Sequence, residues 1–140
     1  MTLTPLRMIV ASGLAISAAF AAPALAGDLT LTPAPAKAVR AEGSFKLSAA
    51  TRIHVVRGDI EARGVAVQLA DLIRRSRGFR PIVVEGPSMG GEAAIVLARQ
   101  GPAGEAYKLD VSPTAVTIAA AQRAGLFYGA MSLWQLATPD

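Results

Sequence analysis

The hydrophobic pattern of the chain changes from a period of two residues to a helical period and back again. In residues 51–56 apolar and polar side chains alternate, which is the pattern of a half-buried strand. Residues 60–77 then carry apolar side chains at helical spacing, and residues 81–85 form a short apolar run. Asp59 before the helix and Gly78 after it favour an N-cap and a left-handed C-cap. This strand–helix–strand order indicates a fold in which helices pack on a sheet.

The rest of the pattern predicts four more strands and a second helix. Residues 44–47 are typical of a strand, and residues 93–98 are apolar on both alternating faces, which predicts a central strand covered on both sides. Residues 107–111 and 116–118 alternate around a Ser-Pro-Thr turn and predict an antiparallel hairpin. Residues 125–137 are helical in pattern. The predicted order is β-β-α-β-β-β-β-α, an α+β fold with a mixed or antiparallel sheet.

The first 26 residues have the features of a secretory signal peptide. A short region containing Arg7 precedes an apolar stretch over residues 8–20, and Ala24-Leu-Ala26 provides a small-x-small cleavage site. The alternative is a membrane anchor, but the stretch is rich in alanine, interrupted by serine and glycine, and broken by Pro23. We therefore predict cleavage after Ala26 and an exported protein, periplasmic or extracellular, that meets the membrane only through this peptide.

Removal of residues 1–26 leaves 114 residues, enough for one modest domain with its own core. Residues 27–42 contain Pro33 and Pro35 and predict an extended lead-in that lies along the domain. The domain itself is predicted over residues 43–137.

The predicted C-terminal helix carries more apolar surface than one sheet can cover. No charged residue lies between Arg123 and Asp140, and apolar side chains occupy well over half of the helical circumference. One interpretation is a deeply buried helix in a self-sufficient domain. The interpretation that we favour is a helix that also contacts a partner, since large apolar patches mark interaction surfaces. The residues predicted to face that partner are Leu126, Phe127, Tyr128, Met131 and Trp134.

Length and composition exclude most catalytic machinery. At 140 residues the chain is too short for a (β/α)₈ barrel, which typically takes about 250. It has no cysteine, so thiolate-ligated metals and disulfides are excluded. Its one histidine, His54, lies on a predicted strand, where a structural role is the usual one. With no metal-binding or phosphate-binding motif, we predict no catalytic residue, metal or cofactor.

The charged residues are also typical of structural roles. The net charge is only +4, and the densest basic patch, Arg74 to Arg80, ends a helix, where cations suit the helix dipole. Contact with an anionic glycan or nucleic acid is the alternative, but no aromatic side chains interleave with these arginines. Asp59 and Glu61 suit a helix N-terminus, while Glu105 and Asp110 flank or line an exposed strand. They do not form the carboxylate pair that glycosidases use.

Three segments of the chain match motifs of one known enzyme family. Gly125-Leu-Phe-Tyr-Gly-Ala-Met-Ser-Leu-Trp-Gln-Leu136 is similar to that family's G-L-x-Y-G-x-x-T-L-x-Q-L segment, with Ser132 at the usual threonine. Glu105-Ala-Tyr-Lys-Leu-Asp-Val111 is similar to its E-x-Y-x-L-x-V strand. Pro33-x-Pro35 and Gly43-Ser-Phe-Lys-Leu47 match the entry to the same region. Over residues 31–137 the chain therefore resembles glycoside hydrolase family 20, the β-N-acetylhexosaminidases.

The resemblance implies the non-catalytic N-terminal domain of such an enzyme, a sheet with two helices packed on one face. In the family this domain packs on a catalytic (β/α)₈ barrel that follows it and carries an adjacent Asp-Glu pair. No Asp-Glu dipeptide occurs in this chain, so no catalytic residue is carried over. Residues 138–140 then correspond to the start of the link to that barrel. The expected partner is the barrel, a glycan is expected only through it, and no nucleic acid is expected.

Two other interpretations stay open from the sequence. The domain could be a stand-alone secreted binding module that uses its C-terminal helix or the basic patch at residues 74–80. It could also be a non-functional truncated remnant.

Overall fold

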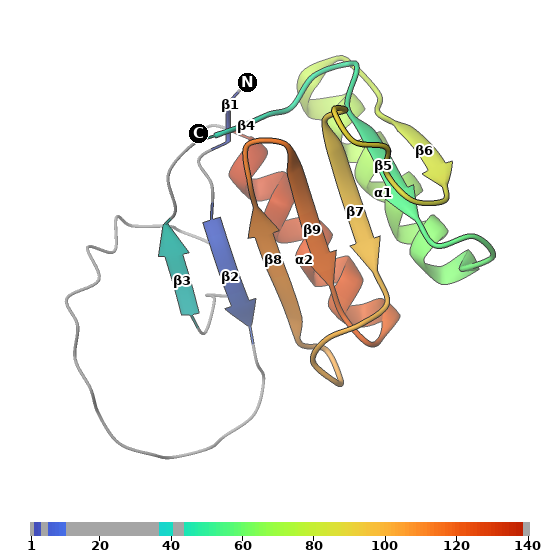
Figure 1. Ribbon diagram of the computed structural model, residues 1–140, viewed down its shortest axis with the longest axis vertical. Helices are drawn as coiled ribbons and strands as arrows, with labels where there is room; N and C mark the ends of the chain where they lie inside the picture. The colour runs from blue at the N-terminus through green and yellow to red at the C-terminus, as the bar shows by residue number, and fades with distance from the viewer. Residues whose placement is uncertain (1, 4–5, 11–36, 41–43, 139–140) are drawn as a thin grey trace.

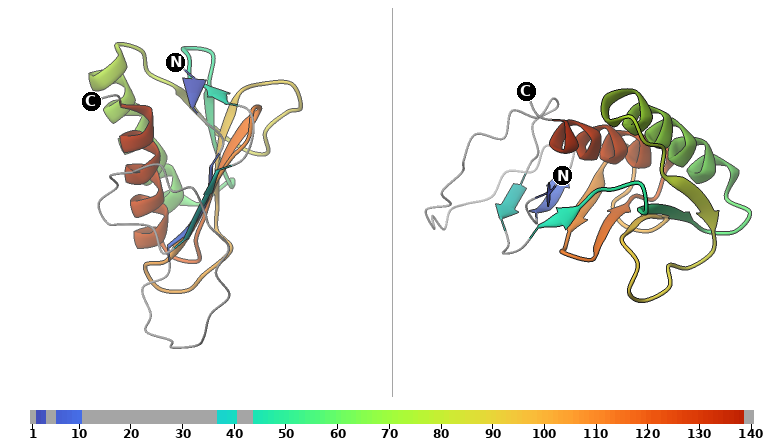
Figure 2. Two further views of the ribbon diagram at one scale, coloured as in Figure 1. Left: turned by 90° about the vertical axis from the view of Figure 1, so that its left-hand side faces the viewer. Right: turned by 90° about the horizontal axis from the view of Figure 1, so that it is seen from above.

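The computed structural model describes residues 2–3, 6–10, 37–40 and 44–138. Two helices lie side by side on one face of a sheet, and among these residues no helix covers the opposite face (Figures 1 and 2). This arrangement confirms the predicted α+β class with both helices on one face. The elements are β1 (Thr2–Leu3), β2 (Leu6–Val10), β3 (Lys37–Arg40), β4 (Phe45–Lys46), β5 (Arg52–Val55), α1 (Ile60–Arg77), β6 (Ile82–Glu85), β7 (Ala94–Ala98), β8 (Tyr107–Val111), β9 (Ala115–Ala119) and α2 (Arg123–Ala137).

The main sheet is mixed. Its strand order is β3-β2-β8-β9-β7-β5-β6. β5 is parallel to β6 and β7, β7 is parallel to β9, and β8 and β9 form the predicted antiparallel hairpin. β1 and β4 pair separately as a two-stranded ribbon. From β4 to α2 the elements follow the predicted order, whereas β1, β2 and β3 lie in the segments predicted as leader and lead-in.

Three sequence expectations need correction. The strand expected over residues 44–47 is only two residues long and lies outside the main sheet. β7 is central, but it is not covered on both sides: Val96 and Ala98 are half-buried, because both helices lie on the other face. α2 starts two residues earlier than the predicted helix, at Arg123. Most of the predicted lead-in lies outside the described residues.

α1 begins and ends where its capping residues predict. Asp59 Oδ1 accepts a hydrogen bond of 2.9 Å from the Ala62 backbone N–H. At the other end Gly78 has φ of 79° and donates its N–H to the Arg74 carbonyl. The inner face of the helix is fully buried on the sheet, through Ala62, Val65, Ala66, Leu69, Ala70 and Ile73.

α2 lies on β8 and β9 at a distance that only glycine allows. A Cβ at Gly125 would meet the Ala106 carbonyl oxygen at 2.4 Å and the Ala120 Cβ at 2.7 Å. A Cβ at Gly129, one turn later, would meet Ile118 Cγ2 at 2.4 Å. The two glycines therefore mark the points where the helix backbone comes closest to the sheet.

The glycine contact predicts opposite effects for two Gly→Ala substitutions. Gly125→Ala should lower the free energy of unfolding by about 2–4 kcal/mol, because backbone atoms of residue 106 cannot yield easily to a new methyl group. Gly64→Ala is the matched control, because a Cβ at this exposed glycine of α1 would have no neighbour within 4 Å outside the adjacent residues and the helix backbone. Alanine there should raise the free energy of unfolding by about 0.5–1 kcal/mol. Urea unfolding of both variants measures the difference. Equal stability of Gly125→Ala and the unsubstituted chain would contradict a glycine-dependent contact.

Candidate functional site

The outer surface of α2 brings together four of the five residues predicted to face a partner. Phe127, Tyr128, Met131 and Trp134 are half-buried and, at about 100° per residue, lie within roughly a third of the helix circumference. Leu126 does not belong with them: it is fully buried against the sheet. We call these four residues the α2 outer surface. No charged side chain interrupts the helix after Arg123, so this surface differs from the charged outer side of α1.

Two contacts hold the α2 outer surface in place. The rings of Phe127 and Tyr128 meet edge to face with centroids 5.8 Å apart. Trp134 Nε1 donates a hydrogen bond of 3.2 Å to Ser76 Oγ, and that hydroxyl donates to the Leu72 carbonyl at 3.0 Å. The indole is therefore anchored to α1 by its polar atom while much of its ring contacts the core. The surface is apolar and oriented before any partner binds.

A buried polar pair lies beneath α2. Tyr107 on β8 and Ser132 on α2 share a hydrogen bond between their hydroxyl groups, and both side chains are almost completely buried. Burial raises the pKa of the Tyr107 phenol, and the bond to Ser132 opposes that shift. The phenol therefore stays neutral at physiological pH and serves as a structural link between helix and sheet.

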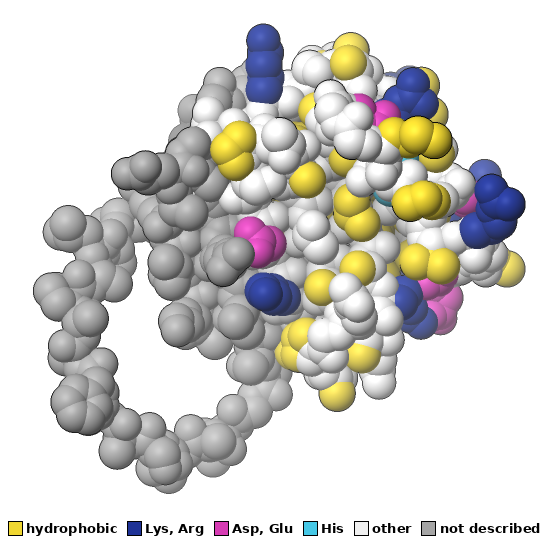
Figure 3. Space-filling view, in the orientation of Figure 1, with side chains coloured by type: hydrophobic (Ala, Val, Ile, Leu, Met, Phe, Trp, Pro, Cys, Tyr) yellow, Lys and Arg dark blue, Asp and Glu magenta, His cyan; other side chains and the backbone are white. Residues whose placement is uncertain are grey.

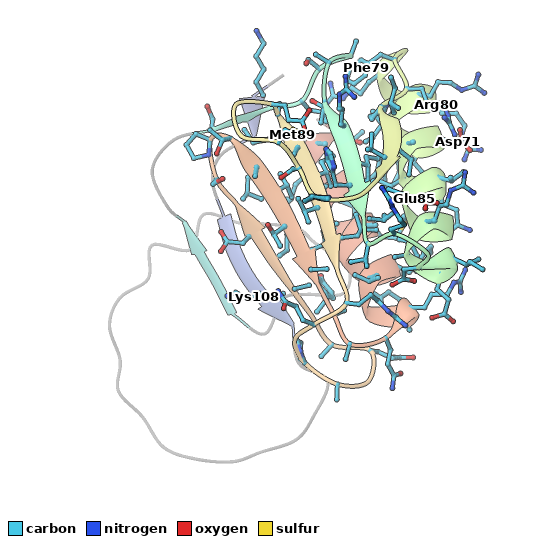
Figure 4. The ribbon with its side chains drawn as sticks, turned by 45° about the vertical axis from the view of Figure 1, so that its right-hand side comes forward. Asp71, Phe79, Arg80, Glu85, Met89 and Lys108 are labelled. Carbon is cyan, nitrogen blue, oxygen red and sulfur yellow. The ribbon has the colours of Figure 1, made fainter. Side chains whose placement is uncertain are left out.

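The predicted basic patch is a solvated helix end. Arg74 and Arg75 are exposed, and Arg80 Nε lies 2.8 Å from Asp71 Oδ1 (Figure 4). The hydrogen bond from Arg80 lowers the pKa of the Asp71 carboxyl. These arginines line neither of the two cavities described below, which agrees with their predicted structural role.

Two of the four predicted acidic residues, Asp59 and Glu61, are engaged in structural ion pairs. Asp59 Oδ2 and Glu61 Oε2 lie 3.2 Å and 2.9 Å from the Arg99 guanidinium, which joins the start of α1 to the end of β7. Glu105 is exposed, and Asp110 lies on the opposite side of the sheet from the helices, lining a cavity with Lys108. The cavity contains no second carboxylate, so the geometry needed for glycoside hydrolysis is absent there.

His54 is part of the sheet's structure, as predicted. Its side chain is buried, and Nδ1 lies 3.2 Å from the Gly86 carbonyl oxygen. Nε2 lies 2.9 Å from Glu92 Oε1, although the N–H direction is not that of a hydrogen bond. The same carboxylate oxygen accepts the Met89 backbone N–H at 3.0 Å. His54 and Glu92 together hold the loop after β6 against β5.

The helix-free face of the sheet carries apolar surface that sequence reasoning missed. Hydrophobic side chains gather over β5, β6 and β7, whereas Lys and Asp lie over β8 (Figure 3). Val56, Ile82 and Met89 are more than half exposed. A cavity of about 390 Å³ near them is lined by His54, Val55, Val56, Arg57, Gly86, Pro87, Val96, Leu97 and Ala98. The signal that could have revealed this face is the apolar character of residues 93–98 on both alternating sides.

Among the described residues, no group of His, Cys, Asp or Glu side chains could hold a metal ion. No helix in that part of the chain has both the length and the apolar character needed to span a membrane.

Comparison with known proteins agrees with the geometry. The family model for glycosyl hydrolase family 20, domain 2, matches residues 28–140. The chain belongs to this family. It corresponds to the non-catalytic N-terminal domain, which accounts for two helices on one face of a mixed sheet and for the lack of a carboxylate pair. The comparison with curated proteins gives no match.

Solved structures of the family share the fold. The GH20 β-N-acetylhexosaminidase of Streptomyces coelicolor A3(2) matches at a TM-score of 0.57 and 39% identity. The N-acetyl-β-hexosaminidase of Streptomyces plicatus, solved in complex with Thio-NAglucal, matches at a TM-score of 0.54 and 42% sequence identity. In both cases the match covers 66% of this chain and 18% of the relative. The chain therefore spans a small part of the length of these enzymes.

The Tyr107–Ser132 pair of this family 20 domain predicts non-additive substitutions. Ser132→Ala should cost about 1–3 kcal/mol of unfolding free energy, because it leaves the buried Tyr107 hydroxyl without its partner. Tyr107→Phe should cost less, because the Ser132 hydroxyl can turn to a carbonyl of its own helix. The double variant should then be more stable than the sum of the two single losses predicts. Denaturant unfolding of all three variants measures the coupling, and strict additivity would show that the hydroxyl groups do not interact.

Proposed function

We propose that the chain is the exported accessory domain of a β-N-acetylhexosaminidase and that its α2 outer surface packs against the catalytic barrel of that enzyme. The observation that carries this proposal is the composition of the surface: Phe127, Tyr128, Met131 and Trp134 lie together on a helix with no charged side chain after Arg123. Such a surface suits a permanent apolar contact within one enzyme.

The domain supplies support and no chemistry. Asp59 and Glu61 are paired with Arg99, and neither described cavity brings two carboxylates together. The relatives that share its fold are named as hexosaminidases, and the chain spans 18% of their length. We therefore assign the hydrolysis of terminal N-acetylhexosamine to the catalytic barrel of the enzyme. This domain would stabilise the folded state of that barrel.

Export is part of the same proposal. Its support is the sequence of residues 1–26, in which a short region containing Arg7 is followed by an apolar stretch and by the small-x-small site Ala24-Leu-Ala26. The complete enzyme would then act in the periplasm or outside the cell, where glycans with terminal N-acetylhexosamine are exposed.

The first test is for activity in the chain alone. The purified 140-residue protein should release no measurable phenol from an aryl N-acetyl-β-glucosaminide, because neither described cavity combines two carboxylates. The S. coelicolor enzyme serves as the positive control under the same conditions. Turnover by the purified chain that persists through further purification would overturn the assignment of chemistry to a barrel.

The second test is a chimera in which residues 28–137 replace the matching segment of the S. coelicolor enzyme. Phe127→Asp with Met131→Asp should lower its temperature of thermal inactivation by at least about 5 °C, because two charges would be buried at the contact. The same pair should affect the isolated chain less, since both side chains are half-exposed there.

The control pair in the chimera is Val56→Asp with Met89→Asp. These residues are exposed on the helix-free face, so they should leave thermal inactivation unchanged. If the Val56 and Met89 pair is the more damaging one, the barrel packs on the sheet face and the proposed surface is wrong.

A further inference from the structure

The carboxyl ends of β5, β6 and β7 meet at one edge of the main sheet, because β5 is parallel to both of the other strands. The chain leaves β5 through α1 on one face and passes from β6 to β7 through residues 86–93 on the other (Figure 2). Open sheets with helical connections bind ligands in the crevice outside the carboxyl ends of their strands, where successive connections go to opposite sides. This edge is therefore the expected place for a small ligand.

The cavity of about 390 Å³ on the helix-free face lies at this edge. It is lined by the ends of β5 and β7 and by the start of the loop after β6. Apart from His54, Gly86 and Arg57, the lining residues are aliphatic or proline. The volume is in the range of small-molecule sites and, at about 30 Å³ for a water-sized group, has room for about a dozen non-hydrogen atoms.

The wall that the loop contributes is fixed to β5. The Gly86 N–H donates a hydrogen bond of 2.9 Å to the Val55 carbonyl, and His54 Nδ1 lies 3.2 Å from the Gly86 carbonyl oxygen. The ring of Pro87 follows directly and restricts the backbone there. The cavity is therefore formed before a ligand arrives, which reduces the cost of ordering the site on binding.

Arg57 is the residue of the lining that carries a permanent charge. It is exposed, so it lies at the mouth of the cavity. The two carboxylates at the start of α1 are both paired with Arg99, and Glu85 lies 3.3 Å from Arg63. Within the described part of the chain Arg57 has no carboxylate partner. An anionic group at the mouth would supply one.

A small amphiphile fits this site better than a protein surface or a sugar does. A flat partner would also cover the ion pair of Arg52 and Glu92 on the same face and would have to desolvate it. A sugar would leave hydroxyl groups without partners against the aliphatic wall. An unbranched chain that ends in a carboxylate matches both the wall and Arg57.

We propose that this cavity binds an aliphatic carboxylate of about eight to ten carbons, a medium-chain fatty acid. Its chain lies along Val56, Val96 and Ala98, and its carboxylate meets Arg57. The site lies on the opposite side of the sheet from the α2 outer surface. The proposal therefore depends neither on the contact with the barrel nor on export.

Titration of the 140-residue protein with sodium octanoate, followed by ¹H–¹⁵N NMR spectra at neutral pH, tests the proposal. A dissociation constant of about 1 mM or lower is expected for a ligand of about ten non-hydrogen atoms in a formed cavity. The signals that move should be those of residues 55–57, 86–87 and 96–98. Hexanoate should bind about tenfold more weakly, because two buried methylene groups are lost.

Two aspartate variants locate the site. Val56→Asp should abolish binding, because it places a negative charge in the apolar wall and beside the carboxylate. Met89→Asp is the matched control: Met89 is exposed on the same face but does not line the cavity, and it lies in the loop away from Glu85 (Figure 4). This variant should bind octanoate as tightly as the unsubstituted chain. Both side chains are more than half exposed, so both variants should stay folded.

Substitution of Arg57 tests the charge. Arg57→Gln should weaken the binding of octanoate about two- to fivefold, the usual range for an exposed ion pair, and Arg57→Lys should restore it. Neither variant should change the binding of octan-1-ol, which has the chain without the charge. Arg75→Gln, at an exposed arginine in the last turn of α1, alters the net charge equally and should affect neither ligand.

Four results would overturn the proposal. They are failure of octanoate to saturate the protein, equal binding by Val56→Asp, signal changes confined to the α2 outer surface, and no response of octanoate binding to Arg57→Gln. Self-association of the chain through residues 55–57 without octanoate would also overturn it, because a second copy would then occupy the cavity. None of these results bears on the contact with the barrel, which the chimera tests separately.

Discussion

The close approach of α2 to β8 and β9 is the contact on which the rest of the domain depends. Gly125 and Gly129 have no room for a Cβ, so the backbone of the helix lies directly on the sheet. That contact sets which way every other side chain of α2 points. Leu126, Ala130 and Leu133 enter the core, Ser132 reaches Tyr107, and the larger side chains point outward. Because small residues of the helix face the sheet, its larger apolar side chains lie on the outer side and are not needed to fill the core.

The glycines also explain why part of the fold follows from sequence and part does not. α1 was predictable because its capping residues and its periodicity are local signals, and both occur where the structure has them. On a helical wheel, α2 is apolar nearly all round, so the wheel alone could not show which side meets the sheet, and Leu126 was placed on the wrong one. Two glycines four residues apart were the available signal, because they mark the side of closest approach.

Other features depend on pairings that no local pattern contains. Residues 2–3 and 6–10 form strands in the structure, whereas their sequence predicted a leader. Composition alone cannot separate the two, because a leader and a buried strand are both rich in apolar residues. The partial exposure of β7 depends on where both helices lie, which is a property of the whole domain. The structural role of His54 was predictable from its strand, whereas its partners Gly86 and Glu92 are more than thirty residues away in the chain.

Two apolar regions remain on opposite sides of the domain, and their charges distinguish them. The helix-free face combines Val56, Ile82 and Met89 with Arg52, Glu92 and Lys108, so a flat apolar partner would have to desolvate charges to cover it. The α2 outer surface carries none after Arg123, and Gln135 is the polar side chain within its arc. Burial of Phe127 and Met131 therefore releases water from apolar surface without the loss of a solvated ion. The α2 outer surface is therefore the better one for a permanent contact with a protein partner, and the helix-free face is the better one for exposure to solvent.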